Sequence, residues 1–140
     1  MIMREMLFKA KTEMIVRTYN NGLDDGEWVK GYLRCDCGMW LIYQFEYDRA
    51  DQVAYEVNPE TICQYIGLTD KNGNKIWEND VVKCQDIIGK IRWNETHLAY
   101  TILANVEGSM QYYFIGERLS NEMEVISNIF DNPELLEGSE

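Results

Sequence analysis

Residues 64–82, QYIGLTDKNGNKIWENDVV, concentrate the turn chemistry of this chain. Short apolar runs alternate here with glycine, asparagine and aspartate, the residue types that best tolerate the backbone angles of tight turns. We assign structural turn roles to six residues of this stretch: Gly67, Asp70, Asn72, Gly73, Asn79 and Asp80.

The Asn72-Gly73 pair predicts a β-hairpin. A two-residue type I′ turn needs positive φ at both central positions, and Asn-Gly adopts that conformation readily. Asp70 is positioned to accept backbone N–H bonds at the entrance of this turn. Beyond the hairpin, Asn79 stands where a left-handed residue would turn the chain again, and Asp80 would cap the amides beside it.

Strand-like segments follow this stretch at intervals of about 8–12 residues, a spacing typical of a small barrel or sandwich. The segments expected as strands in this half are residues 81–85, 87–93, 98–104, 112–115 and 123–130. We therefore predict a mostly β fold, with a small antiparallel SH3-like barrel or a sandwich in the C-terminal half.

The N-terminal half adds further strands. Leu41, Tyr43 and Phe45 alternate with polar residues and fall on one face of a strand, and Gly31 is a candidate β-bulge. The strands expected here are residues 4–11, 14–19, 27–33, 39–47 and 53–57.

Helices are expected only as single turns. Two Asn-Pro-Glu steps, at residues 58–60 and 132–134, combine an asparagine cap, a proline at the first position and an acid in the first turn. We expect one domain over residues 1–140, with residues 1–58 and 59–140 as candidate lobes.

Composition narrows the class of protein. The 140 residues are 46% hydrophobic, which favours an ordered core over intrinsic disorder. A net charge of −11 opposes binding to nucleic-acid phosphates, unless basic residues cluster locally. The first residues lack the pattern of a signal peptide, and no apolar run is long enough to span a membrane. We therefore expect a cytoplasmic protein.

The motifs together resemble the YopX-like proteins of bacteriophages and prophages. The residues that carry the resemblance are Gly67-Leu68, Asp70, Asn72-Gly73, Ile76, Asp80, Val82, Glu124-Val125-Ile126, Asn128-Ile129 and Asn132-Pro133-Glu134-Leu135-Leu136. The N-terminal segments around residues 4–11 and 26–33 match as well. Two positions depart from the family pattern, since Asn79 and Ser127 stand where glycine is usual. The resemblance implies a β-rich fold encoded by mobile elements of bacteria, and it supplies no catalytic residues.

The four cysteines are the candidate metal ligands. Cys35, Cys37, Cys63 and Cys84 could surround a tetrahedral zinc ion. Their spacing, with one close pair and two scattered residues, is not that of the usual structural zinc sites. We favour ordinary reduced thiols in a cytosolic protein and assign no metal.

The remaining polar motifs indicate no catalysis. His97 is the only histidine and falls in a turn between two expected strands, so we assign no catalytic residue. A calcium loop starting at Asp70 would need Gly at its sixth position and Glu at its twelfth, where this chain has Lys75 and Val81. No phosphate-binding glycine motif or other cofactor site is present.

These observations favour a non-enzymatic phage or prophage accessory protein that binds a host or phage protein in the bacterial cytoplasm, with no cofactor and with a homo-oligomer as an option. The alternative is a nucleic-acid-associated module that uses a barrel face with a basic patch around Lys83, Lys90 and Arg92. A small metal protein built on the cysteines is the third hypothesis. The aromatic residues Trp77, Trp93, Tyr112 and Tyr113 could stack on bases, but we assign them to core packing.

Overall fold

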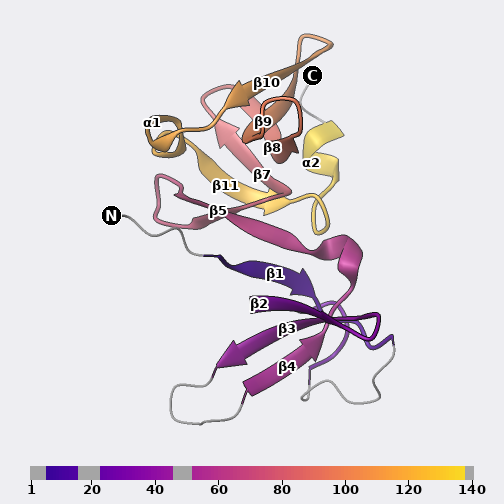
Figure 1. The fold of residues 1–140 in the computed structure, drawn as a ribbon. Coiled ribbons are helices and arrows are strands. Elements are labelled where there is room, and N and C mark those ends of the chain that lie inside the picture. Colours follow the sequence, from indigo (N-terminus) through magenta and orange to yellow (C-terminus); the bar gives the residue numbers. More distant parts are fainter. Residues whose placement is uncertain (1–5, 16–22, 46–51, 138–140) are drawn as a thin grey trace. The chain divides into compact units, whose positions relative to one another are not determined.

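The computed structural model describes residues 6–15, 23–45 and 52–137. The chain forms two compact units, Met1–Gln64 and Tyr65–Glu140. Each consists mainly of antiparallel β-structure, and the helical elements are single turns (Figure 1). The predicted mostly β fold with single-turn helices is confirmed.

The first unit contains a β-meander. Its strands are β1 (Phe8–Lys11), β2 (Trp28–Asp36), β3 (Met39–Phe45) and β4 (Gln52–Glu56). They pair in the order β4-β3-β2-β1, and β1 also pairs with the first two residues of β5 (Cys63–Thr69). Between β4 and β5, the short helix η1 (Pro59–Thr61) is capped by Asn58, whose side chain accepts the Glu60 N–H at 3.0 Å.

Residues of β1, β2 and β3, together with Val57 after β4, form the first core. Ala10, Val29, Ile42 and Val57 are buried together, with aromatic and aliphatic side chains packed around them. A strand was predicted at residues 14–19. The prediction is wrong for Met14 and Ile15, which lie outside any strand. Residues 16–19 lie outside the described residues.

Gly31 marks a close approach of two strands instead of a bulge. It pairs in regular register with Phe8. A Cβ atom built on Gly31 would lie 2.1 Å from the carbonyl oxygen of Tyr43 on β3. Only a residue without a side chain fits between these backbones.

The second unit begins as β5 continues into a hairpin with β6 (Lys75–Trp77). A five-stranded antiparallel sheet follows, in the order β10-β9-β8-β7-β11. Its strands are β7 (Asp80–Cys84), β8 (Ile87–Asn94), β9 (Ala99–Val106), β10 (Ser109–Phe114) and β11 (Glu124–Asn128), with α1 (Glu117–Ser120) before β11 and α2 (Glu134–Glu137) after it.

The five strands expected after residue 80 are present, but within the described residues they form an open sheet and no closed barrel. β10 and β11 are its two edges and do not pair. The turn of α1 connects them, and a register shift between Val125 and Ser127 interrupts the pairing of β11 with β7.

The hairpin of residues 64–82 turns differently from the predicted type I′ turn. The Gly73 N–H donates to the Asp70 carbonyl at 3.1 Å, and the Asp70 N–H donates to the Asn74 carbonyl at 2.8 Å. Within this fully described loop, positive φ occurs at Gly73 (82°) and not at Asn72. The loop therefore has three residues, with a tight turn followed by a left-handed glycine.

The side chain of Asp70 holds this loop. Its carboxylate accepts the N–H groups of Asn72 and Asn74 at 2.9 Å each, and that of Val125 on β11, also at 2.9 Å. Burial by itself raises the pKa of this carboxyl, but the donors from Val125, Asn74 and Asn72 together outweigh it and hold the pKa below its usual value. One buried carboxylate thus joins the hairpin to a strand 55 residues away.

Asn79 and Asp80 form the next joint. Asn79 adopts the left-handed conformation (φ 70°), and its backbone bonds to Ile91 and Ile129. The Asp80 carboxylate accepts the Trp77 N–H at 2.8 Å. Ser127, the other departure from the glycine pattern, has no positive φ; its hydroxyl donates to the Asn132 side chain at 2.6 Å.

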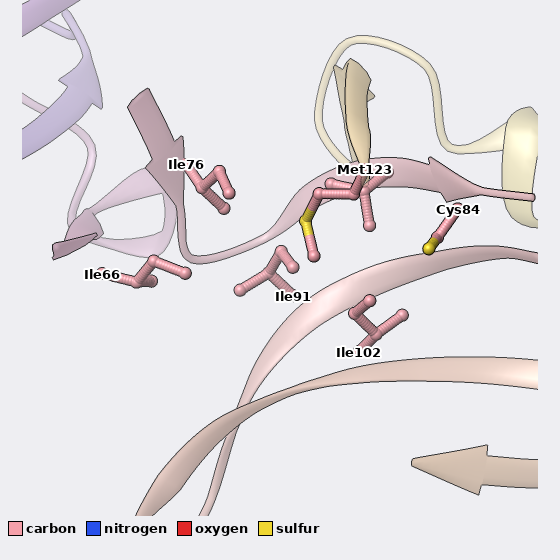
Figure 2. Packing of buried hydrophobic residues seen from close by; sticks show 7 residues of the cluster. Ile66, Ile76, Cys84, Ile91, Ile102 and Met123 are labelled. Carbon is pink, nitrogen blue, oxygen red and sulfur yellow. The ribbon is translucent and has the colours of Figure 1, made fainter. Parts of the chain in front are cut away.

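The second core lies against the inner face of the five-stranded sheet (Figure 2). Its buried members come from β5 to β9 and from the segment before β11: Ile66, Ile76, Val82, Cys84, Ile91, Ile102 and Met123. Met123 directly precedes β11, and its carbonyl accepts the Lys71 N–H from the hairpin loop at 3.0 Å. Packing and hydrogen bonding thus both join the β5–β6 hairpin to the segment before β11.

Two type I′ hairpin turns occur where the sequence analysis expected none. Cys37-Gly38 joins β2 to β3, and Glu107-Gly108 joins β9 to β10; all four residues have positive φ. Cys37 therefore lies in a turn and not on a strand. Leu98, predicted to start a strand, is instead a left-handed, exposed turn residue.

Replacement of Asp70 tests its role. We expect Asp70→Ala to lower the free energy of unfolding by about 3 kcal/mol in denaturant titrations, because each hydrogen bond to a charged acceptor contributes roughly 1.5–3 kcal/mol. The exposed carboxylate Asp86 provides a control, and Asp86→Asn should change stability by less than about 0.5 kcal/mol.

The stability difference between the wild type and Asp70→Asn should depend on pH. Because the folded-state pKa lies below the ordinary 3.8, the stabilisation is complete above the unfolded-state pKa and is lost as the pH falls through the folded-state value. The gap should stay constant from neutral pH down to about pH 5 and shrink below pH 4. A gap that widens on acidification would contradict this assignment.

Gly31→Ala should destabilise the first unit by several kcal/mol, or prevent its folding, because the new methyl group would collide with the backbone of β3. Gly116→Ala is a suitable control, since a Cβ there meets no atom within 4 Å and the residue has no positive φ. Circular dichroism during denaturant titration would measure both variants. Equal stability of the two would disprove the close approach.

Candidate functional site

The candidate site is the face of the five-stranded sheet opposite its core, here called the outer face. Strand register places residues of neighbouring strands on the same side when they are paired: Lys90 pairs with Leu103, and Leu103 pairs with Tyr112. Because side chains alternate along each strand, every second residue from these three lies on the same face. The outer face includes Lys83 of β7, Ile88, Lys90 and Arg92 of β8, Thr101, Leu103 and Asn105 of β9, and Met110, Tyr112 and Phe114 of β10.

β10 is exposed along its whole length and forms one edge of the sheet. Met110, Tyr112 and Phe114 are 58%, 46% and 53% exposed. Val106 and Ser109 flank the two-residue turn and therefore form a hydrogen-bonded pair. By alternation, the backbone N–H and C=O groups of Met110, Tyr112 and Phe114 point away from β9. The strand thus presents apolar side chains together with backbone groups that pair with no other described strand.

Three rings form an aromatic cluster at one end of β10. The His97 and Phe114 rings meet edge to face with centroids 5.2 Å apart, and Tyr112 and Phe114 do so at 5.7 Å. His97 Nε2 lies 3.2 Å from the Tyr112 hydroxyl. The backbone N–H of His97 donates to the Asn94 side chain at 3.0 Å, which orients the turn. These contacts hold exposed rings in defined positions, so little side-chain entropy remains to be lost on binding.

Basic side chains lie on the same face. Lys90 and Arg92 occupy alternate positions of β8, and Lys83 pairs with Ile88 on that side. Burial, followed by the charge of Arg92, lowers the pKa of Lys90. Among the described side chains, neither Lys90 nor Arg92 forms an ion pair. The β8 part of the outer face therefore carries two basic side chains on a chain whose net charge is −11, whereas Lys83 is paired across the sheet with Glu124 of β11.

A hollow of about 190 Å³ opens on this face. Leu136 of α2 lies on one side, in keeping with the contact of this helix with β8. The other described side chains that line it include Ile88, Lys90, Leu103, Asn105 and Met110. The side-chain oxygen of Asn105 is buried and has no hydrogen-bond partner within the described structure. An unsatisfied buried acceptor is costly, and such a group calls for an explanation.

The predicted turn residues lie in the segment from β5 to the start of β7. Gly67 (φ 94°) lies within the irregular pairing of β5 and β6, and the other five form the hairpin loop and the joint after β6. They organise backbone and line neither the hollow nor the aromatic cluster.

The four cysteines differ in their surroundings. Cys35 and Cys37 are exposed at the β2–β3 hairpin, whereas Cys63 and Cys84 are buried in different units. Burial, followed by the charge of Glu122, raises the pKa of Cys84. Over the described ranges, no group of three or more His, Cys, Asp and Glu side chains could hold a metal ion.

The assignment of the aromatic residues to the core is correct for Trp77 and wrong for others. Trp77 is buried, but Trp93, Tyr112 and Tyr113 are between 36% and 46% exposed. Sequence reasoning missed Met110, Phe114 and Asn105. The period of two in Met110, Tyr112 and Phe114 was an available signal, but alternation alone does not tell which face of an edge strand is covered.

No helix among the described residues has the length or apolarity to cross a membrane, because each is a single turn.

Comparison with known proteins finds a matching family and similar solved structures. No curated protein matches the chain. The crystal structure of protein EF1440 from Enterococcus faecalis is similar, with 19% identity, coverage of 94% of this chain and 96% of that one, and a TM-score of 0.43. The model of the family described as YopX protein matches residues 16–137, which is most of the sequence. The chain therefore belongs to the YopX protein family.

Proposed function

We propose that this YopX-family chain is a bacteriophage or prophage accessory protein that acts by binding another protein in the cytoplasm of the bacterial host. The outer face of the five-stranded sheet is its binding surface. The proposed partner is a host or phage protein, and no cofactor takes part.

One observation carries the proposal: β10 is an edge strand exposed at all six positions, with apolar and aromatic side chains on its outer side. Exposed aromatic residues and methionine are enriched at protein interfaces, where tyrosine is a frequent hot-spot residue. The ring contacts of His97, Tyr112 and Phe114 pre-orient this surface. A single exposed apolar residue would need no explanation, whereas a continuous row does.

A second candidate function, binding of single-stranded nucleic acid, has one observation in its favour. Lys90 and Arg92 lie on the same face as Tyr112 and Phe114, and cations beside aromatic rings are a common platform for bases and phosphates. Against it stands the net charge of −11, which repels a polyanion. Two or three cations would also release few counterions. We therefore favour a protein partner.

Quantitative affinity capture from a bacterial host lysate tests the first function with matched variants. Proteins that bind the wild type specifically should be lost with Tyr112→Ser/Phe114→Ser and retained with Tyr32→Ser, which removes an exposed tyrosine of the first unit. Truncation of interface hot spots weakens binding by roughly 30-fold or more, so the loss should be evident by mass spectrometry. Equal recovery with all three proteins would refute the proposed surface.

Fluorescence anisotropy with labelled single- and double-stranded oligonucleotides separates the second function from the first. We expect no saturable binding at low salt, where electrostatic association is strongest. Saturable binding that weakens steeply with salt, and that Arg92→Gln reduces, would favour the nucleic-acid function instead.

A further inference from the structure

We propose that the hollow beside β10 is a specificity pocket that accepts one apolar side chain of an extended, acidic segment of the partner protein. This inference rests on the proposed protein-binding function and adds the chemistry of the bound segment.

The size of the hollow sets the class of occupant. Its volume of about 190 Å³ exceeds the roughly 150 Å³ of an apolar cavity that binds benzene. It lies well below the roughly 300 Å³ where pockets for drug-sized ligands begin. One leucine or phenylalanine side chain therefore suits it better than a free cofactor or a nucleotide.

The lining sets the polarity of that occupant. Ile88, Leu103, Met110 and Leu136 offer aliphatic and thioether surface, which favours burial of an apolar group. Asn105 contributes a buried side-chain oxygen without a donor. A backbone N–H of a bound polypeptide would satisfy this oxygen and remove a cost that the free protein bears.

The charge around the hollow indicates which residues should flank the apolar side chain in the bound segment. Lys90 lines the hollow, and Arg92 follows two positions later on the same face. Neither has an acidic partner among the described side chains. Carboxylates on either side of the apolar residue would pair with these cations at short range. The repulsion from the net charge of −11 is screened beyond about 8 Å at physiological salt.

A peptide chain also fits the surface better than a nucleic acid does. The described lining of the hollow includes no aromatic wall on which a base could stack, and a base without stacking loses much of its binding energy. Among the described residues, the outward backbone groups of β10 have no strand partner, and an extended polypeptide can replace their bound water with a ladder of hydrogen bonds.

Titration of the isotopically labelled full chain with defined peptides, followed by NMR, tests the inference. The probe is a capped nonapeptide with a central leucine flanked by glutamates. One control peptide has lysines in place of the glutamates, and another has serine in place of the leucine. We expect saturable shifts at Ile88, Leu103 and the Asn105 side-chain amide, with a dissociation constant below about 1 mM. Each control peptide should bind at least tenfold more weakly.

Two variants of the protein complete the test. Lys90→Gln should weaken binding of the acidic probe about tenfold, and Asn105→Leu should weaken it several-fold, as expected for loss of one hydrogen bond. Lys75→Gln, on β6 and away from the outer face, should leave the affinity unchanged. The spectra of the variants report directly whether each one remains folded.

The contrary outcomes are distinct. Absence of saturable shifts at the hollow, or equal binding of the acidic and basic probes, overturns this inference. The peptide titration can fail while the affinity capture still shows loss of the captured proteins with Tyr112→Ser/Phe114→Ser. The protein-binding function is then retained, and only the acidic nature of the bound segment is refuted. Tighter binding of a short single-stranded oligonucleotide than of the acidic peptide at the same residues overturns the inference in favour of nucleic acid.

Discussion

The second unit depends on the buried carboxylate of Asp70. Its oxygens accept backbone donors from its own loop and from Val125 of β11, so one side chain determines both the shape of the hairpin and the position of an edge strand. Asparagine, a neutral side chain of similar size, keeps one acceptor oxygen for Asn72 and Asn74 but would leave the Val125 N–H facing an amide group that cannot accept it. A second hydrogen bond, from the Lys71 N–H to the Met123 carbonyl, joins the same hairpin loop to the segment before β11. The side chain of Met123 packs in the second core. The sheet that bears the outer face is therefore held at its β11 edge by a polar contact with the hairpin.

Much of this fold follows from local sequence patterns. Turn residues, period-two segments and Asn-Pro caps were sufficient to predict the strands of the second unit and the single turns η1 and α2, because these features depend on neighbours in the chain, but α1 was not predicted. The sequence did not reveal that Asp70 bonds to Val125, since that contact joins residues 55 positions apart. It also did not distinguish an open sheet from a barrel. Closure depends on whether β10 and β11 meet, which no local pattern encodes.

The candidate site was less predictable than the fold. Tyr112 was assigned to the core because aromatic residues on alternating strands usually pack there, yet it lies on an edge strand with an uncovered side. Lys83, Lys90 and Arg92 were recognised as a potential basic patch, and strand register does bring them to one face. The importance of Asn105 had no sequence signal, because an unpaired amide is recognised only once its surroundings are known. Which side chains share the outer face is thus decided by the strand register, and the register depends on the pairing of the whole sheet.

The uncovered edge of β10 also bears on the solubility of the protein. Unpaired strand edges with apolar side chains can template pairing between identical chains, and natural proteins limit this hazard with charge, bulges or coverage. β10 itself carries no charged residue, so local protection is absent. The net charge of −11 provides a different safeguard, because copies of the chain repel one another before their edges meet. High salt weakens this repulsion, and colloidal stability should then depend on whether a partner already occupies the edge.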